Sequence, residues 1–117
     1  MKKILIVDDN PFSTFLLKEC LEKRKYKIID LDNSENISKI LEIEKPELVI
    51  LDLVMPKKSG FDILKVIKNV PVIVLSSLDT TEAKEKALRL GAKHFVAKPF
   101  NPKYLNELVK EEMAYIN

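Results

Sequence analysis

Five polar side chains that could do chemistry stand directly after short apolar segments of this sequence. They are two adjacent carboxylates, Asp8 and Asp9, a third carboxylate at Asp52, the hydroxyl of Ser76 and the ammonium of Lys98. Carboxylate ligands without histidine or cysteine favour a hard cation, and Mg²⁺ is the best candidate. A carboxylate beside such an ion can attack a phosphoryl group, while a hydroxyl and an ammonium hold the remaining phosphoryl oxygens. Brought together, these residues predict an aspartyl-phosphate site.

The four apolar segments that precede these residues, together with a further one at Ile28–Leu31, are predicted to be buried strands. They are short and rich in β-branched and aliphatic residues, which is typical of strands covered on both faces. The predicted strands are Ile4–Val7, Ile28–Leu31, Leu48–Leu51, Val72–Leu75 and Phe95–Ala97.

Helix signals fill the intervals between these strands. The expected helix starts are, in chain order, Asn10-Pro11, Ser34, Ser59, Asp79 with Glu82 as a capping box, and Asn101-Pro102. Gly91 is expected just beyond the end of the fourth helix. Apolar residues recur at helical spacing, and the stripe of the first helix comprises Leu16, Leu17, Cys20 and Leu21. We therefore expect the cysteine to lie in the core.

Strict alternation of strand and helix predicts an α/β fold with a parallel sheet covered by helices on both faces. For so short a chain, the expected architecture is the three-layer, flavodoxin-like (βα)5 fold with strand order 2-1-3-4-5. Ligands of such sheets bind beyond the carboxyl ends of the strands, where Asp8, Asp9 and Asp52 come from neighbouring strands. Ser76 and Lys98 would lie at the rim of that carboxylate cluster.

Length and composition support a single domain over residues 1–117, with no separate output domain. The 117 residues are 46% hydrophobic and 32% charged, which suits a globular core and excludes disorder. The formal net charge is only +2 and the positive residues are dispersed, so we expect no nucleic-acid partner. No apolar run is long enough to span a membrane, and we expect a cytoplasmic location. The single cysteine excludes an internal disulfide.

Taken together, the motifs resemble the receiver domain of two-component response regulators, of the chemotaxis-regulator type. The resemblance covers almost the whole chain and is specific because the motifs stand in this order. They are Leu5-Ile6-Val7-Asp8-Asp9, Leu51-Asp52 with Met55-Pro56 and Gly60, Ser76, and Lys98-Pro99-Phe100. Lys58 and Ser59 depart from the usual family pattern, and the segment between Asp52 and Ser76 is short.

The resemblance implies a role for each matched residue. Asp52 corresponds to the phosphoacceptor, and Ser76 and Lys98 to the two phosphate contacts. Asp9 corresponds to the direct ligand of Mg²⁺, and Asp8 to its neighbour, which reaches the ion mainly through water. The remaining ligands correspond to Asp52 and the backbone carbonyl of Val54. The aromatic switch residue corresponds to Phe95, and the Lys98-Pro99 bond to the family's cis peptide.

The implied function is a stand-alone phosphorylation switch rather than an enzyme. The phosphoryl donor is a sensor histidine kinase, a phosphotransfer protein or a small acyl phosphate. We expect a monomer that signals to an unidentified protein through the face formed by the fourth helix, fifth strand and fifth helix. His94 is expected to be a surface residue without a site role.

Three other functions remain open from the sequence. A small aspartate-dependent phosphatase would need its nucleophile in an Asp-x-Asp motif after the first strand, where this chain has Asp8-Asp9-Asn10. A flavin-binding module would need a phosphate-binding loop there, and two aspartates would repel the phosphate. A phosphorylation-independent scaffold would not require the complete set of residues.

Overall fold

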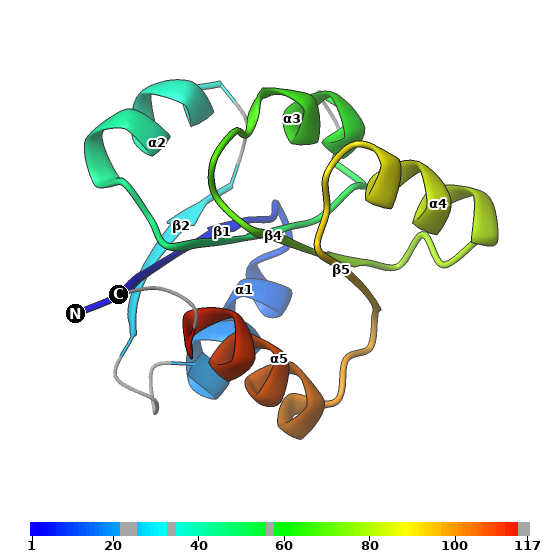
Figure 1. Cartoon of the computed structure of the whole chain (residues 1–117). Helices are drawn as coiled ribbons and strands as arrows, with labels where there is room; N and C mark the ends of the chain where they lie inside the picture. Colours follow the sequence, from blue (N-terminus) through cyan, green and yellow to red (C-terminus); the bar gives the residue numbers. More distant parts are fainter. Residues whose placement is uncertain (22–25, 33–34, 56–57, 115–117) are drawn as a thin grey trace.

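The computed structural model describes residues 1–21, 26–32, 35–55 and 58–114, and strands and helices alternate through them (Figure 1). The strands are β1 (Lys3–Val7), β2 (Lys27–Leu31), β3 (Leu48–Leu51), β4 (Val72–Ser76) and β5 (His94–Ala97). The helices are α1 (Pro11–Leu21), α2 (Ile37–Glu44), α3 (Gly60–Val66), α4 (Thr81–Arg89) and α5 (Pro102–Ala114). Among these helices, none has the length and apolar character needed to cross a membrane.

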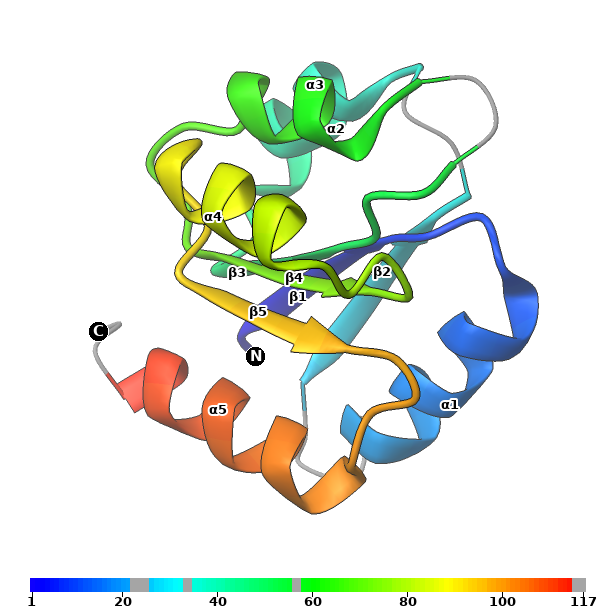
Figure 2. The same ribbon diagram turned by 90° about the vertical axis from the view of Figure 1, so that its right-hand side faces the viewer.

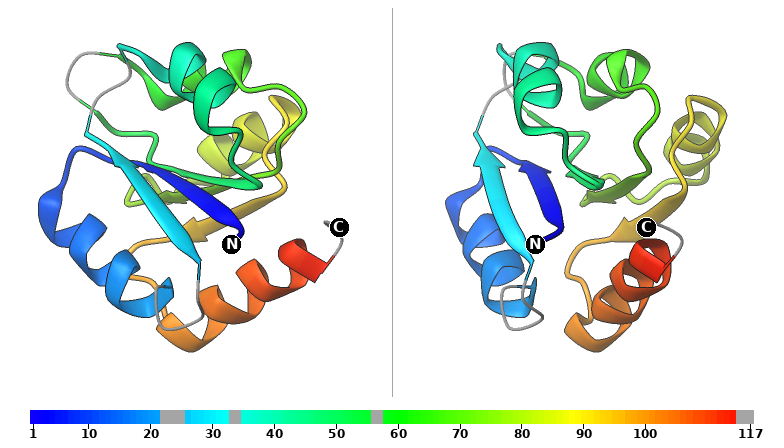
Figure 3. Two further views of the ribbon diagram at one scale, coloured as in Figure 1. Left: turned by 90° about the vertical axis from the view of Figure 1, so that its left-hand side faces the viewer. Right: turned by 60° about the vertical axis from the view of Figure 1, so that its left-hand side comes forward.

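The strands form one parallel sheet in the order β2-β1-β3-β4-β5, which confirms the predicted topology. Figure 3 shows β2 beside β1 at one edge of the sheet, and β5 forms the other edge. In the register of β1 with β3, Val7 lies opposite Leu51. The residues that follow these two, Asp8 and Asp52, therefore leave the sheet side by side.

Helices cover both faces of the sheet, so the inner strands bury alternate residues on opposite sides. The edge strand β2 differs from the expectation of a buried strand, because its residues are only partly buried or exposed. Ile4 and Ile6 belong to the core beneath α1 and α5, whereas Leu5 and Val7 belong to the core beneath α2, α3 and α4 (Figures 1 and 2). This two-sided burial explains why β1, β3 and β4 are almost continuously apolar in the sequence.

Most predicted helix ends are confirmed by their hydrogen bonds. The Asn10 side chain accepts from the backbone N–H groups of Phe12 and Ser13, and Asn101 accepts from Tyr104 N–H. Ser59 caps α3 by accepting from Phe61 N–H at 3.2 Å.

Two predicted helix starts need comment. The capping box of Asp79 and Glu82 is wrong, because Thr80 is the N-cap of α4 and accepts from Ala83 N–H at 3.1 Å. The N-cap of α2 is Asn36, and the predicted start at Ser34 lies outside the described residues. At the other end of α4, Gly91 directly follows the C-cap residue Leu90, as predicted, and its φ of +110° lies in the left-handed region that glycine tolerates.

Three side-chain environments also differ from expectation. Leu16 is 39% exposed, so the buried stripe of α1 is narrower than predicted. Cys20 is only partly buried, and its Sγ lies 3.6 Å from the carbonyl oxygen of Pro102. His94 is not a free surface residue, because its Nε2 lies 2.8 Å from Oε1 of Glu112, a buried residue near the end of α5.

Candidate functional site

The backbone ladder carries the acidic residues to one edge of the sheet. Asp8 N–H donates to the Leu31 carbonyl at 3.1 Å, and Asp52 N–H donates to the Val7 carbonyl at 2.9 Å. Both residues thus remain tied to neighbouring strands after the regular strands have ended. Their side chains project into the same crevice, where a carboxylate oxygen of Asp8 lies within 4.8 Å of one of Asp52.

Three carboxylates meet in this crevice. Asp8, Asp9 and Asp52 each offer an oxygen, and these oxygens all lie within 4.8 Å of one another. Asp8 is 4% exposed and Asp52 is 6% exposed, while Asp9 is more open to solvent. The convergence predicted from strand order is confirmed. Three negative charges this close require compensation, since charge repulsion is strong where solvent is largely excluded.

Lys98 supplies part of this compensation. Its Nζ donates to Asp8 Oδ2 at 2.8 Å and to Asp52 Oδ2 at 3.3 Å, and its side chain is only 18% exposed. The cis peptide bond between Lys98 and Pro99, implied by the family resemblance, is present at the start of the connection to α5.

The remaining carboxylate oxygens of the cluster differ in whether they accept a hydrogen bond. Asp8 Oδ1 accepts from Asn10 N–H at 2.9 Å, and Asp52 Oδ1 accepts from Val54 N–H at 3.1 Å. Asp9 has no hydrogen-bond or ion-pair partner among the described residues. Its oxygens are therefore the most available of the three for an added cation.

The donor set fits Mg²⁺. All three groups are oxygen donors on hard carboxylates, they converge within one coordination sphere's reach, and one side of the cluster is open to water. Mg²⁺ keeps several water ligands, so a partly open cluster suits it better than an enclosed cage. The lysine ammonium offsets only one of three negative charges, which leaves the cluster electrostatically able to accept a divalent cation.

Ser76 reaches the same edge of the sheet from β4. It pairs with Ala97 of β5, and Lys98 N–H donates to the Ser76 carbonyl at 3.0 Å. The serine is fully buried, and its Oγ accepts from Leu78 N–H at 3.1 Å. The hydroxyl that the sequence associates with phosphate binding is therefore also hydrogen-bonded to the loop that leads into α4.

Gly60, the first residue of α3, lies very close to the backbone of the segment that follows β3 and carries Asp52. A Cβ atom there would lie 2.3 Å from Leu53 Cα and 2.6 Å from the Asp52 carbonyl oxygen. Gly60 N–H also donates to the Leu53 carbonyl at 3.0 Å. The sequence contained this glycine within a motif, but only the close approach explains it: α3 packs directly onto the backbone that carries Asp52.

Phe95 and two apolar residues surround the site more distantly. Phe95 is half-buried on β5 and packs against the core beneath α2, α3 and α4. Val54 is 51% exposed and Leu78 is 37% exposed, and each follows a site residue by two positions. Their backbone N–H groups bond to Asp52 and Ser76, so both residues lie beside the crevice.

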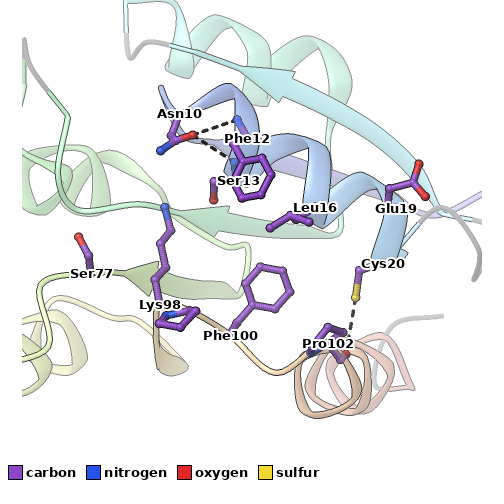
Figure 4. Close-up of a pocket in the computed structure, with 11 residues that line it drawn as sticks. Asn10, Phe12, Ser13, Leu16, Glu19, Cys20, Ser77, Lys98, Phe100 and Pro102 are labelled. Carbon is purple, nitrogen blue, oxygen red and sulfur yellow. Dashed lines mark hydrogen bonds between the residues drawn. The ribbon is translucent and has the colours of Figure 1, made fainter.

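An apolar groove of about 580 Å³ adjoins the site, between α1 and the segment from β5 to α5. Figure 4 shows Phe12 and Leu16 of α1 facing Phe100, with Lys98 and Asn10 at one end and Cys20 at the other. This groove could not be predicted from the sequence, because the helical spacing placed Leu16 on the buried stripe of α1. One feature of the sequence does indicate exposed apolar surface on α1: the helix carries more apolar residues than one buried stripe can hold.

Comparisons with known proteins agree with this geometry. Residues 4–110 match the family model of the response regulator receiver domain. The chain is 36% identical over 113 residues to the alkaline phosphatase synthesis transcriptional regulatory protein PhoP of Bacillus subtilis, covering 93% of this chain and 47% of PhoP. It thus spans about half the length of the curated relatives that it matches.

Solved structures share the whole fold. A two-component response regulator from Clostridium difficile superposes with a TM-score of 0.94 at 25% identity, covering 100% of this chain and 99% of that one. A CheY-like receiver domain protein from Methanospirillum hungatei JF-1 gives a TM-score of 0.89 at 26% identity, with coverage of 97% and 94%.

Proposed function

This chain belongs to the response regulator receiver domain family of two-component signalling, and from that premise we propose that Asp52 is its phosphoacceptor. The observation that carries the proposal is the cluster itself. The oxygens of Asp8, Asp9 and Asp52 lie within 4.8 Å of one another, and Lys98 contacts both Asp8 and Asp52. Of the three aspartates, Asp52 alone is both buried and adjacent to the loop that begins α3.

The residues of the proposed cation site differ in how free their carboxylate oxygens are to bind a metal ion. Asp9 binds Mg²⁺ directly because its carboxylate is unpartnered among the described residues, and Asp52 and the Val54 carbonyl complete the protein ligands. Asp8 contributes mainly through water, since its oxygens already accept from Asn10 and Lys98. When bound, the ion neutralises negative charge on the carboxylates and on phosphoryl oxygens.

Transfer requires one bond to form and one to break. A carboxylate oxygen of Asp52 attacks phosphorus, and the bond between phosphorus and the donor nitrogen of a phosphohistidine, or the donor oxygen of an acyl phosphate, breaks. The leaving group departs with the electron pair. Lys98 then exchanges its carboxylate contact for a phosphoryl oxygen, and the Ser76 hydroxyl donates to another.

The phosphodonor protein docks, in this proposal, on the apolar groove beside the site. Phe12 is 67% exposed and Leu16 is 39% exposed, so together they present apolar surface that a docked protein would cover. The groove ends at Lys98 and Asn10, so a protein seated in it reaches the mouth of the crevice (Figure 4). Replacing Leu16 by Ser should slow phosphorylation by the kinase but leave phosphorylation by an acyl phosphate unchanged.

The signal leaves through Ser76, Phe95 and the surface of α4, β5 and α5. Phosphorylation shifts the population between two packings of this region, because Ser76 leads into α4 and Lys98 leads into α5. The expected partner is a protein, since the formal net charge of +2 is dispersed over the chain. Receiver domains are signalling domains, and this proposal requires no turnover of a substrate.

The test is stoichiometric phosphorylation by a small acyl phosphate in the presence of Mg²⁺. Intact-mass measurement should detect one added phosphoryl group on the wild type and none on Asp52→Asn. Asp62→Asn, an exposed aspartate of α3, is the matched control and should be labelled like the wild type. Turnover of a phosphomonoester by the purified chain would instead favour the phosphatase alternative.

A further inference from the structure

The ammonium of Lys84, on α4, lies between two groups that the switch would have to move. Its Nζ is 3.0 Å from Asp79 Oδ1, in the loop that joins β4 to α4. The same Nζ lies 6.0 Å from the centre of the Phe95 ring on β5. Figure 2 shows α4 lying alongside β5, so one side chain can contact both the loop and the strand.

The pair of Asp79 and Lys84 occupies positions that usually hold an apolar contact. Thr80 is the N-cap of α4, so Asp79 immediately precedes the cap and Lys84 is the fourth residue of the helix. Side chains at these two positions commonly pack together and fix the angle at which the chain enters a helix. Here the contact is ionic, and it links the β4–α4 loop to the first residues of α4.

This loop is also tied to Ser76. Leu78 N–H donates to Ser76 Oγ at 3.1 Å, and Asp79 N–H donates to the Ser77 carbonyl at 2.9 Å. A change of the Ser76 side-chain rotamer that carries Oγ toward a phosphoryl group on Asp52 gives up the first of these bonds. The residues that then lose a restraint are the ones that lead directly to Asp79.

At its other contact, Lys84 favours the present position of the Phe95 ring. A cation near an aromatic face is attracted by the ring's negative face, and this attraction is lost if the ring turns away. Phe95 is only half-buried, so packing alone does not hold it as firmly as it holds a fully enclosed side chain.

We propose that Lys84 is a positioning residue that stabilises the unphosphorylated arrangement by holding Asp79 and Phe95 together. The inference rests on the proposed function, since it concerns the regulation of the Asp52 site. Lys84 and Asp79 side chains are each 48% exposed, so the contacts are modest and suit an equilibrium that must remain reversible. Removing the lysine should shift the population toward the activated packing.

The experiment measures the concentration of beryllofluoride, a phosphoryl mimic, at which the ¹⁵N-labelled full chain is half-saturated in excess Mg²⁺. The amide signals of Phe95 and Val96 report the switch. In Lys84→Met, half-saturation should fall by about two- to fivefold, the factor equivalent to losing an exposed cation–π contact. Lys84→Arg keeps the charge and should titrate like the wild type.

Lys86→Met is the matched control. It removes the same charge from the same helix, but its ammonium lies over Phe61, 4.4 Å from the ring centre, and not near Phe95. This variant should titrate within error of the wild type. As a single substitution, Asp79→Asn should lower the beryllofluoride concentration at half-saturation. In the Lys84→Met background it should lower that concentration no further, because the two residues act through one contact.

The outcomes separate this inference from the proposed function. If the wild type titrates and Lys84→Met is indistinguishable from Lys86→Met, or requires more beryllofluoride, the role of Lys84 is refuted and the Asp52 site stands. If the wild type shows no change with beryllofluoride and Mg²⁺, the proposed function fails and this inference fails with it.

Discussion

Replacing Lys98 by Met removes the positive charge that Asp8 and Asp52 share. The substitution keeps an unbranched side chain of similar reach, so packing of the stem changes little. Before the change, the Nζ lies 2.8 Å from Asp8 Oδ2 and 3.3 Å from Asp52 Oδ2. Afterwards, two carboxylates whose side chains are 3% and 7% exposed face each other without that cation.

The magnitude follows from the burial of these partners. Removing one member of a buried ion pair costs roughly 3–5 kcal/mol, because the remaining charge stays desolvated. Lys98 is 18% exposed and the Asp9 side of the cluster is open, so water can partly replace the ammonium. We therefore expect a loss of about 3 kcal/mol in the free energy of unfolding, at the lower end of that range.

Urea denaturation without divalent cations measures this loss. Lys65→Met is the matched control, because Lys65 pairs with Asp62 on the surface of α3, where both side chains are more than half exposed. That variant should lose at most about 1 kcal/mol. Excess Mg²⁺ should reduce the deficit of Lys98→Met, since the ion binds only the folded cluster and supplies the missing positive charge.

Two results would refute this reasoning. If Lys98→Met were no less stable than Lys65→Met, the ammonium would not be compensating the buried carboxylates. If Mg²⁺ stabilised the wild type more than Lys98→Met, the lysine would not be competing with the cation for the same negative charge.

Three further predictions address the site. Asp9→Ala should lose most Mg²⁺ affinity and Asp8→Ala should lose less, as measured by Mg²⁺ titration; equal losses would contradict the assignment of the direct ligand. Val54→Asn combined with Leu78→Glu should accelerate decay of the phosphorylated state by about tenfold, because polar side chains at these positions can orient the attacking water and apolar ones cannot. Decay at the wild-type rate would show that other residues control the lifetime of the phosphorylated state. Gly60→Ala should cost about 1–3 kcal/mol in urea denaturation, since its Cβ meets backbone rather than a flexible side chain; a smaller loss would mean that α3 shifts freely.

The fold could be predicted because each level of the sequence indicates the same answer. Apolar blocks such as Leu48–Leu51 are too short for helices and have no polar face, which requires a sheet covered on both sides. Strand order then places the residues after β1 and β3 together. The convergence of Asp8, Asp9 and Asp52 followed from topology alone, without any knowledge of side-chain conformation.

The sequence could not predict features that depend on which of several nearby groups a side chain contacts in the folded chain. Asp79 has the right spacing for a capping box, but Thr80 caps α4 and leaves Asp79 free to pair with Lys84. His94 has no sequence neighbour that signals a partner, since Glu112 reaches it only through the packing of α5 on the sheet. Leu16 fits a helical stripe, yet α1 is rotated so that this residue lines the groove.

The prediction of one stand-alone domain over residues 1–117 stays a prediction, as do the individual roles of the site residues. The chain matches the receiver-domain family over residues 4–110, and the curated relatives are about twice as long as the chain.

The central claim, that Asp52 carries the phosphoryl group, is tested most directly by mapping the modified residue. After treatment with a small acyl phosphate and Mg²⁺, borohydride reduces an aspartyl phosphate to the corresponding alcohol, and mass spectrometry of the digested chain locates it. The account predicts that the reduced residue is found at position 52 and nowhere else. Reduction at Asp8 or Asp9, or a phosphorylated chain without a reducible residue at position 52, would contradict it.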